Sequence, residues 1–279
     1  MSDSDEIKNK IKTVGTQASG DAISHSAKAE CGIAVMAKAS APGLTKTRLV
    51  PPLTPDEAAA FNTAFLQDVT NNLLLAGRRT GIAGYAAFGP PGSEAFFRRT
   101  LSPDIELIDA WLPNFGECLR LTIEEILARG HNSAVVLNSD SPTLPTSLLI
   151  ETAERLARPG DRAVLGPSSD GGYYLLGLKT AHRRMFENID WSTERVAEQT
   201  LERAREIDLD VHMLPVWYDV DDVESLRMLH AELSRPRPAV SRLIHYDARH
   251  TAALMDRLCQ EGDFARRIGA LMQLEELRA

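Results

Sequence analysis

Short apolar runs, rich in β-branched or small residues, recur along the middle of the chain. Each run is too short for a core helix and is bounded by turn residues, which is typical of strands buried in a sheet. In chain order the runs are "CGIAVMA", "GIAGYAAF", "SAVVLNSD", "RAVLGP", "GYYLLGL" and "LDVHMLPVW". The pattern therefore predicts six buried strands.

Longer amphipathic segments separate these runs and predict helices. The clearest has Thr54 as a candidate N-cap, Pro55 at its first helical position, acids in its first turn and Gly77 at its end. Further helices are expected at 115–130, at about 145–157 and at 192–206. Strands that alternate with helices predict an α/β fold, with right-handed crossovers and a mostly parallel sheet covered by helices on both faces.

The two ends of the chain differ from its middle. Residues 1–29 are polar and lack periodicity, so we expect a flexible N-terminal tail before a domain at 30–234. The "RPRP" run at 235–238 interrupts helical continuity and predicts a linker that opens a helical appendage at 235–279. The apolar stripes of the appendage suit packing on the domain, which we favour, and also suit a homodimer through these helices.

Composition limits the possible functions. The chain has 279 residues, 43% of them hydrophobic, and a net charge of −8, which argues against broad nucleic-acid binding. It has no apolar run long enough to span a membrane and no secretory h-region, so we expect a cytoplasmic protein. The three cysteines lack the paired spacing of zinc or redox motifs, and free thiols are expected.

The stretch "KASAPGLTKTRL" gathers cations directly after the first predicted strand. Lys38, Lys46 and Arg48 are candidates to meet phosphate oxygens, and Gly43 lets the backbone approach a ligand. A nucleotide-triphosphatase P-loop does not fit, because other residues stand where that motif needs glycine. The alternative is a solvated basic loop.

Carboxylates follow two other predicted strands. Asp140 lies in "NSDSP", and Asp219 and Asp221 lie in "DVDD". Alternate residues of an extended segment point to one side, so either of the latter two could join Asp140 in a site for Mg²⁺ or Mn²⁺ completed by substrate phosphates. The alternatives are a turn or N-cap role for Asp140 and helix capping for the "DVDD" acids.

Asp170 precedes two glycines and a strand in "SSDGGYY". The pair Gly171 and Gly172 indicates either a plain hairpin turn or a close approach of the backbone to a ligand. The residues alone favour the hairpin.

Taken together, these motifs resemble a family of bacterial GT-A-type glycosyltransferases, often labelled radical-SAM/selenodomain-associated or arsenosugar-biosynthesis transferases. The resemblance covers about 31–226 and rests on "PGLTKTRL", "NSDSP", "GPSSDGGYYLLGL", "FENIDWSTERV" and "DVDDVESL". The chain departs from the family pattern at Asn138, where glycine is usual, and in "WLPNFGECLR", where Trp111 and Cys118 stand near the usual Gln and Arg.

The resemblance implies a nucleotide-diphosphosugar transferase fold (GT-A, Rossmann-like) shared with the 2-phospholactate and molybdenum-cofactor guanylyltransferases. It implies that Lys38, Gly43, Lys46 and Arg48 bind nucleotide phosphates, and that Asp140 and Asp221 hold Mg²⁺ or Mn²⁺.

The function expected from this resemblance is metal-dependent transfer of a sugar from a nucleotide-sugar donor to a small acceptor. Asp170 is the candidate catalytic residue, Gly171, Gly172 and Tyr173 are candidates for sugar or acceptor contacts, and Trp191 is either a sugar platform or a core anchor. The alternatives are a nucleotidyltransferase acting on a phosphorylated small molecule and a non-catalytic nucleotide-binding module.

Overall fold

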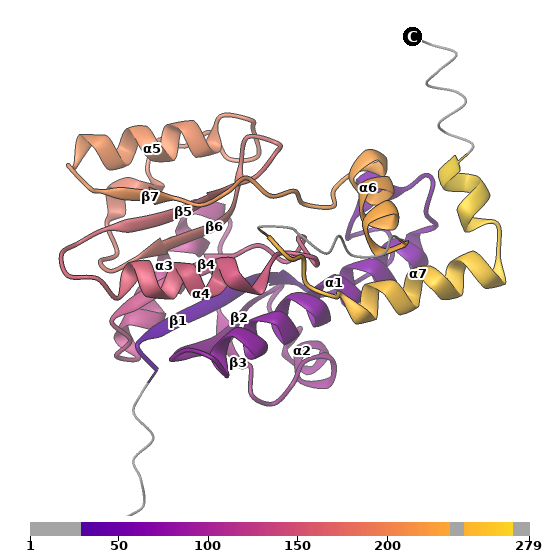
Figure 1. The fold of residues 1–279 in the computed structure, drawn as a ribbon, viewed down its shortest axis with the longest axis horizontal. Helices are drawn as coiled ribbons and strands as arrows, with labels where there is room; N and C mark the ends of the chain where they lie inside the picture. The colour runs from indigo at the N-terminus through magenta and orange to yellow at the C-terminus, as the bar shows by residue number, and fades with distance from the viewer. Residues whose placement is uncertain (1–28, 235–242, 270–279) are drawn as a thin grey trace, which may run out of the picture.

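A computed structural model of the chain describes residues 29–234 and 243–269 (Figure 1). Residues 1–28 of the N-terminal tail expected at 1–29, and the "RPRP" linker, lie outside these residues. Seven strands form one sheet in the order β3-β2-β1-β4-β6-β5-β7. They are β1 (Cys31–Lys38), β2 (Ile82–Gly89), β3 (Glu106–Asp109), β4 (Ser133–Leu137), β5 (Ala163–Pro167), β6 (Tyr173–Leu178) and β7 (Val211–Met213).

The sheet is mostly parallel, as the sequence predicts. β6 runs antiparallel to both β4 and β5, whereas the pairings β1 with β2, β1 with β4, β2 with β3 and β5 with β7 are parallel. The connection from β5 to β6 is therefore a hairpin, which confirms the interpretation that the paired glycines favour.

The helices separate the strands along the chain. They are α1 (Pro55–Gly77), α2 (Glu94–Thr100), α3 (Phe115–Ala128), α4 (Thr146–Leu156), α5 (Val196–Glu206), α6 (Val223–Ser234) and α7 (Arg249–Glu261), with short 3-10 turns η1 (Thr47–Leu49) and η2 (Arg183–Phe186). The sequence patterns miss α2 and β3, which are both short. None of the helices within the described ranges combines the length and apolarity that a membrane crossing requires.

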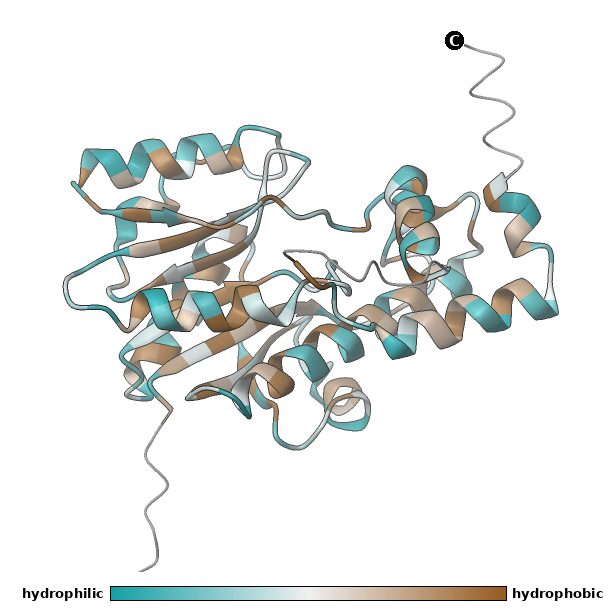
Figure 2. Cartoon of the chain, in the orientation of Figure 1, coloured by the Kyte–Doolittle hydropathy of each residue, from teal (hydrophilic) through white to brown (hydrophobic). Residues whose placement is uncertain are grey.

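Helices cover both faces of the sheet (Figure 1). On one face the strands pack against apolar residues of α1, α2 and α4, among them Leu73, Phe97 and Leu149. On the other face they pack against α3, η2 and α5 through residues such as Ile123 and Phe186. Figure 2 shows mainly apolar strands between helices of mixed hydropathy, as expected for a sheet that is buried on both sides.

The start of α1 is fixed by the residues that the sequence singles out. The Thr54 hydroxyl accepts a hydrogen bond from Glu57 N, and the Glu57 carboxylate accepts one from Thr54 N, which together form a capping box. Pro55 occupies the first helical position, where its missing N–H costs nothing. This arrangement fixes the start of α1, which is the next element along the chain after η1.

Two predicted boundaries are wrong. The helix expected from Ser192 begins at Val196, because Ser192 has a positive φ of 65° and the Thr193 hydroxyl closes a turn onto Asp190 O. The last strand is confined to Val211–Met213, because Pro215 has no N–H to continue the ladder.

A third apolar cluster joins the described part of the appendage to α1. Phe61 and Phe65 of α1 pack with Leu254, Met255 and Phe264, and the rings of Phe61 and Phe264 are stacked 6.0 Å apart. The apolar side chains of α7 therefore pack on their own chain, as we favour from the sequence. A homodimer through these helices stays a prediction.

Asp68 of α1 caps the N-terminus of α7. Its carboxylate accepts hydrogen bonds from His250 N at 3.0 Å, from Thr251 N at 2.7 Å and from the Thr251 hydroxyl at 2.7 Å. Ala248, at the N-cap position, has no side chain that could accept these bonds. A carboxylate on another helix thus takes the part of the N-cap residue.

Candidate functional site

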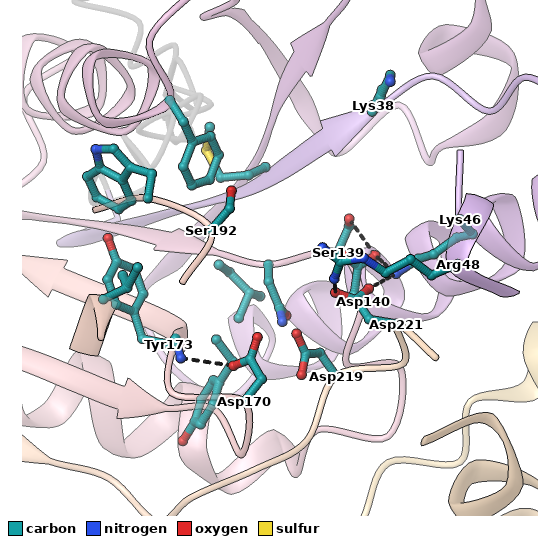
Figure 3. A pocket seen from close by; sticks show the side chains of 18 of the residues that line it. Lys38, Lys46, Arg48, Ser139, Asp140, Asp170, Tyr173, Ser192, Asp219 and Asp221 are labelled. Atoms are coloured by element: carbon teal, nitrogen blue, oxygen red, sulfur yellow. Dashed lines mark hydrogen bonds and ion pairs between the residues drawn. The ribbon is translucent and has the colours of Figure 1, made fainter. Parts of the chain in front are cut away.

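A cavity of about 850 Å³ opens at the carboxyl ends of β1 and β4 (Figure 3). The chain leaves β1 toward β2 on one side and β4 lies on the other side, so this is the point where the strand order reverses. In open α/β sheets, ligands bind in the crevice at such a point. The predicted site residues line this cavity, with two exceptions, Gly43 and Gly171.

Lys46 joins the two carboxylates that the sequence proposes as metal ligands. Its Nζ lies 2.8 Å from Asp140 Oδ1 and 2.8 Å from Asp221 Oδ1, and it donates a hydrogen bond to Val220 O at 2.9 Å. The Lys46 side chain is 6% exposed, and its backbone adopts a left-handed conformation with φ 50°. The folded chain thus directs this ammonium group into the site.

The electrostatics of Lys46 follow from these neighbours. Burial by itself lowers the pKa of Lys46, but Asp140 and Asp221 outweigh burial and raise the pKa above its ordinary value. Lys46 is therefore charged at neutral pH. Its charge compensates two carboxylates that would otherwise repel each other.

The pair Asp140 and Asp221 fits a divalent cation chemically. Both carboxylates converge on one point, and Mg²⁺ is commonly held by one or two carboxylates with substrate phosphates supplying further oxygens. Residues 29–234 and 243–269 contain no group of three or more His, Cys, Asp or Glu side chains placed to hold a metal. A metal at this pair would require phosphate oxygens and the displacement of the Lys46 ammonium.

The other predicted cations lie around this centre. Arg48 Nη1 is 4.0 Å from Asp221 Oδ2, and the Arg48 side chain is 74% exposed, so it can turn toward a ligand. Lys38 Nζ donates to Leu44 O at 3.0 Å and does not contact the carboxylates. Gly43 has a φ of 74°, which explains a glycine in this turn. The loop therefore presents a cationic edge to the cavity.

Asp219 and Asp170 also line the cavity, and Asp219 lies between Asp170 and Asp221 (Figure 3). Burial, together with the nearby charges of Asp170 and Asp221, raises the pKa of Asp219 to about 6, against the opposing hydrogen bond from the Ser168 hydroxyl. The Asp170 carboxylate accepts a hydrogen bond from Gly172 N at 2.9 Å. Two carboxylates thus face the middle of the cavity.

Gly171 serves packing rather than direct contact with the cavity. A Cβ placed on Gly171 would lie 2.0 Å from Glu194 O, and the residue has a φ of 89°. Its carbonyl accepts a hydrogen bond from Ala197 N at 3.0 Å. The β5–β6 turn and the segment before α5 therefore fit tightly together, with Gly172 lining the cavity.

Trp191 forms an aromatic wall with Phe115. The two rings meet edge to face at 5.5 Å, and a Cβ on Gly116 would lie 2.7 Å from the indole nitrogen. Trp191 lines the cavity and also packs on the core behind it. It is therefore a core anchor, and its role as a sugar platform stays a prediction. Of the altered 111–120 segment, Phe115 and Leu119 line the cavity, whereas Trp111 packs on Gly89 and Cys118 is buried.

The cavity-lining residues that sequence reasoning missed include Asn138, Phe115 and Glu194. The sequence could have indicated Asn138, because this residue stands where the family pattern usually has glycine. Phe115 is exposed at the first turn of α3, and its neighbour Asn114 caps that helix, so its position is that of an ordinary helix start. Glu194 belongs to the turn that was predicted to be helical.

Comparison with known proteins supports the α/β fold described above. Residues 73–193 match the model of a family described as "Uncharacterized protein conserved in bacteria (DUF2064)". A crystal structure from Desulfovibrio desulfuricans G20, provisionally assigned as a nucleotide-diphospho-sugar transferase, is 27% identical with a TM-score of 0.69. The match covers 82% of this chain and 98% of that protein. The chain therefore has the mostly parallel, Rossmann-like α/β fold of that structure.

Two further solved structures are less similar to the chain. A cytidylyltransferase from Leptospira borgpetersenii is 11% identical over 84% of this chain and 96% of that one, with a TM-score of 0.48. Rv0371c from Mycobacterium tuberculosis, in complex with manganese, is 16% identical over 71% of this chain and 96% of that one, with a TM-score of 0.39. No curated protein matches the chain.

Proposed function

We propose that the protein is a glycosyltransferase that moves a sugar from a nucleotide-diphosphosugar to a small acceptor. The observation that carries the proposal is the charged centre in which Lys46 meets Asp140 and Asp221 at the carboxyl ends of the central strands. Support comes from the 27% identity to the Desulfovibrio protein, whose provisional assignment is a nucleotide-diphospho-sugar transferase. The three cations of the β1 loop suit a diphosphate.

Charge develops on the nucleoside diphosphate as it leaves the sugar. Lys46 and Arg48 are placed to neutralise that charge, since both line the cavity beside the end of β1. Donor phosphates would compete with Asp140 and Asp221 for the Lys46 ammonium. Binding of the donor is therefore expected to open the Lys46 bridge.

A divalent cation, Mg²⁺ or Mn²⁺, would be held by Asp140 and Asp221. When bound, it would supply further positive charge to the departing diphosphate. The convergence of the two carboxylates on one point supports this role.

Asp170 is our candidate for accepting the proton of the acceptor hydroxyl. Its carboxylate lines the cavity and is anchored by Gly172 N. Tyr173, Gly172 and Trp191 line the same side and would contact the sugar or the acceptor. The acceptor would thus approach from the side opposite the basic loop.

Product analysis tests the proposal against its rival. The protein is incubated with sugar nucleotides or with nucleoside triphosphates, Mn²⁺ and a mixture of small acceptors. Release of nucleoside diphosphate from a sugar nucleotide, lost in Asp140→Ala, is expected. Release of pyrophosphate from a triphosphate would instead identify a nucleotidyltransferase, and binding without any product would identify a nucleotide-binding module.

A further inference from the structure

The two ends of the cavity differ in charge. The basic residues among its described lining, Lys38, Lys46 and Arg48, come from the end of β1 and the segment that follows it. The far end is built from 115–119, 170–174 and 191–196, and its charged lining residues are Asp170 and Glu194. The cation of these segments, Arg195, does not line the cavity and lies 3.7 Å from Asp190 Oδ2. An anionic group bound at the far end would therefore meet carboxylates without a cavity-lining cation to pair with it.

The far end also carries a fixed apolar surface. Trp191 and Phe115 meet edge to face, and Gly116 leaves no space between α3 and the indole ring. Figure 3 shows Tyr173 and Ser192 on this side of the cavity, away from Lys46 and Arg48. Rigid aromatic faces suit the apolar face of a sugar ring or an aromatic ring.

Two polar atoms in the cavity wall lack partners within the described part of the chain. They are Tyr173 Oη and Asn138 Oδ1, and both are buried. Asn138 donates through Nδ2 to Ser141 Oγ at 3.1 Å, which leaves its carbonyl oxygen as an acceptor. A buried polar atom without a partner costs free energy, and a hydrogen bond from a ligand hydroxyl to either atom would offset that cost.

We infer that the second substrate is an uncharged, hydroxyl-bearing molecule with a flat apolar face, held between Trp191, Phe115 and Tyr173, rather than a phosphorylated or carboxylated one. This inference rests on the proposed function, because it assigns the basic loop to the donor phosphates. Asn138 and Tyr173 set the hydrogen bonds that select hydroxyl groups. The acceptor end thus excludes phosphate esters by the charge of Asp170 and Glu194 and by the absence of cations among its cavity-lining residues.

The test uses the full chain labelled with 5-fluorotryptophan and observed by fluorine NMR. The chain has three tryptophans, so Trp191→Phe assigns the resonance of interest and Trp111 provides an internal control outside the cavity. Two probes share one ring: phenyl β-glucoside, which is neutral, and phenyl phosphate, which is anionic. We expect phenyl β-glucoside to shift the Trp191 resonance saturably, at concentrations at least about 10-fold lower than phenyl phosphate.

Two variants test the orphaned polar atoms. Tyr173→Phe and Asn138→Gly are each expected to weaken phenyl β-glucoside binding about 2- to 10-fold, the effect of one hydrogen bond. Tyr173→Phe should not lower the melting temperature, because the hydroxyl that it removes has no partner among the described residues. A lower melting temperature with unchanged probe binding would show a purely structural role and overturn the assignment.

Failure of this inference can be distinguished from failure of the proposed function. Equal or tighter binding of phenyl phosphate, or no Trp191 shift with either probe, would overturn the inference. Binding of nucleoside diphosphate depends on Lys46 and Arg48 and is measured in a separate titration without either probe. A chain that binds the diphosphate but not phenyl β-glucoside would keep the function and lose the inference.

Discussion

Lys46 Nζ lies 2.8 Å from Asp221 Oδ1, although 175 positions separate the two residues in the sequence. This contact joins the loop after the first strand to the segment after the last one. A single ammonium group therefore compensates Asp221 and also Asp140 at the point where the strand order of the sheet reverses. We propose that an exogenous cation would bind at the same point and displace the Lys46 ammonium.

Removal of the Lys46 ammonium should create a better metal site. In Lys46→Met, Asp140 and Asp221 lose their partner and repel each other, so the free energy of unfolding without metal should fall by about 1–2 kcal/mol. Added Mn²⁺ should then raise the melting temperature of the variant more than that of the wild type. Differential scanning fluorimetry with and without Mn²⁺ measures both effects.

Lys38→Met is the matched control, because Lys38 lines the same cavity and does not contact the two carboxylates. It should leave the Mn²⁺ response unchanged. An equal Mn²⁺ response in the wild type and in Lys46→Met would show that Lys46 does not occupy the cation position.

Gly171→Ala should be severely destabilising. A methyl group at this position meets Glu194 O, and the positive φ adds backbone strain, so we expect a loss of at least about 3 kcal/mol. Gly92→Ala separates the two causes, because Gly92 has a similar φ of 82° and no atom within 4 Å of its added Cβ. It should cost about 1 kcal/mol in urea unfolding. Similar losses in both variants would contradict the packing role of Gly171.

Much of the fold is visible in the sequence because the strands are buried on both faces. Runs such as that of β1 are then continuously apolar, and Thr54 with Pro55 marks the start of α1 unambiguously. The turn around Ser192 is harder to predict, because its backbone is left-handed and the segment that follows it is joined to the β5–β6 hairpin by a hydrogen bond from Ala197 N to Gly171 O. Local helical periodicity cannot report such contacts.

The site is predictable in part for a similar reason. Carboxylates and cations that follow strands are recognised from their order along the chain, and the structure brings Lys46, Asp140 and Asp221 together. The Lys46 bridge itself is a long-range contact that no spacing reveals. Phe115 also escapes notice, because an exposed aromatic residue at a helix start has no distinguishing pattern before Trp191 is placed beside it.

Asp68→Ala tests the capping of α7 by α1. The change leaves His250 N, Thr251 N and the Thr251 hydroxyl without their acceptor, so it should lower the free energy of unfolding by about 1–2 kcal/mol. Exposed Glu154 on α4 offers a control, and Glu154→Ala should change stability by less than about 0.5 kcal/mol. Urea unfolding measures both. Equal stability of the two variants would contradict the capping role.

The ion pair of Glu57 and Arg267 should make stability depend on pH. Burial acts to raise the pKa of Glu57, but the hydrogen bonds from Arg267 and from Thr54 N outweigh it and hold the pKa below its ordinary value of 4.5. The stabilisation is therefore complete above pH 4.5 and is lost as the pH falls through the lower folded-state pKa. Glu57→Gln should cost about 1 kcal/mol at pH 7.

The same variant should approach the stability of the wild type as the pH falls below 4.5. Arg267→Met should reproduce this pH dependence, because it removes the partner at 2.5 Å from Glu57 Oε1. Thermal unfolding between pH 3 and pH 7 measures the difference. A constant difference across this range would show that the charge of Glu57 contributes nothing.

The central claim is that the basic loop and the carboxylate pair form a nucleotide-diphosphate site. Isothermal titration calorimetry with a panel of nucleoside diphosphates in Mn²⁺ tests it most directly, with wild type, Lys46→Met, Arg48→Ala and Asp140→Ala. We predict saturable binding of at least one diphosphate, weakened about 10-fold or more by Arg48→Ala and dependent on Mn²⁺ in a manner that Asp140→Ala abolishes. Absence of binding by every diphosphate, or binding that none of these substitutions changes, would contradict the claim.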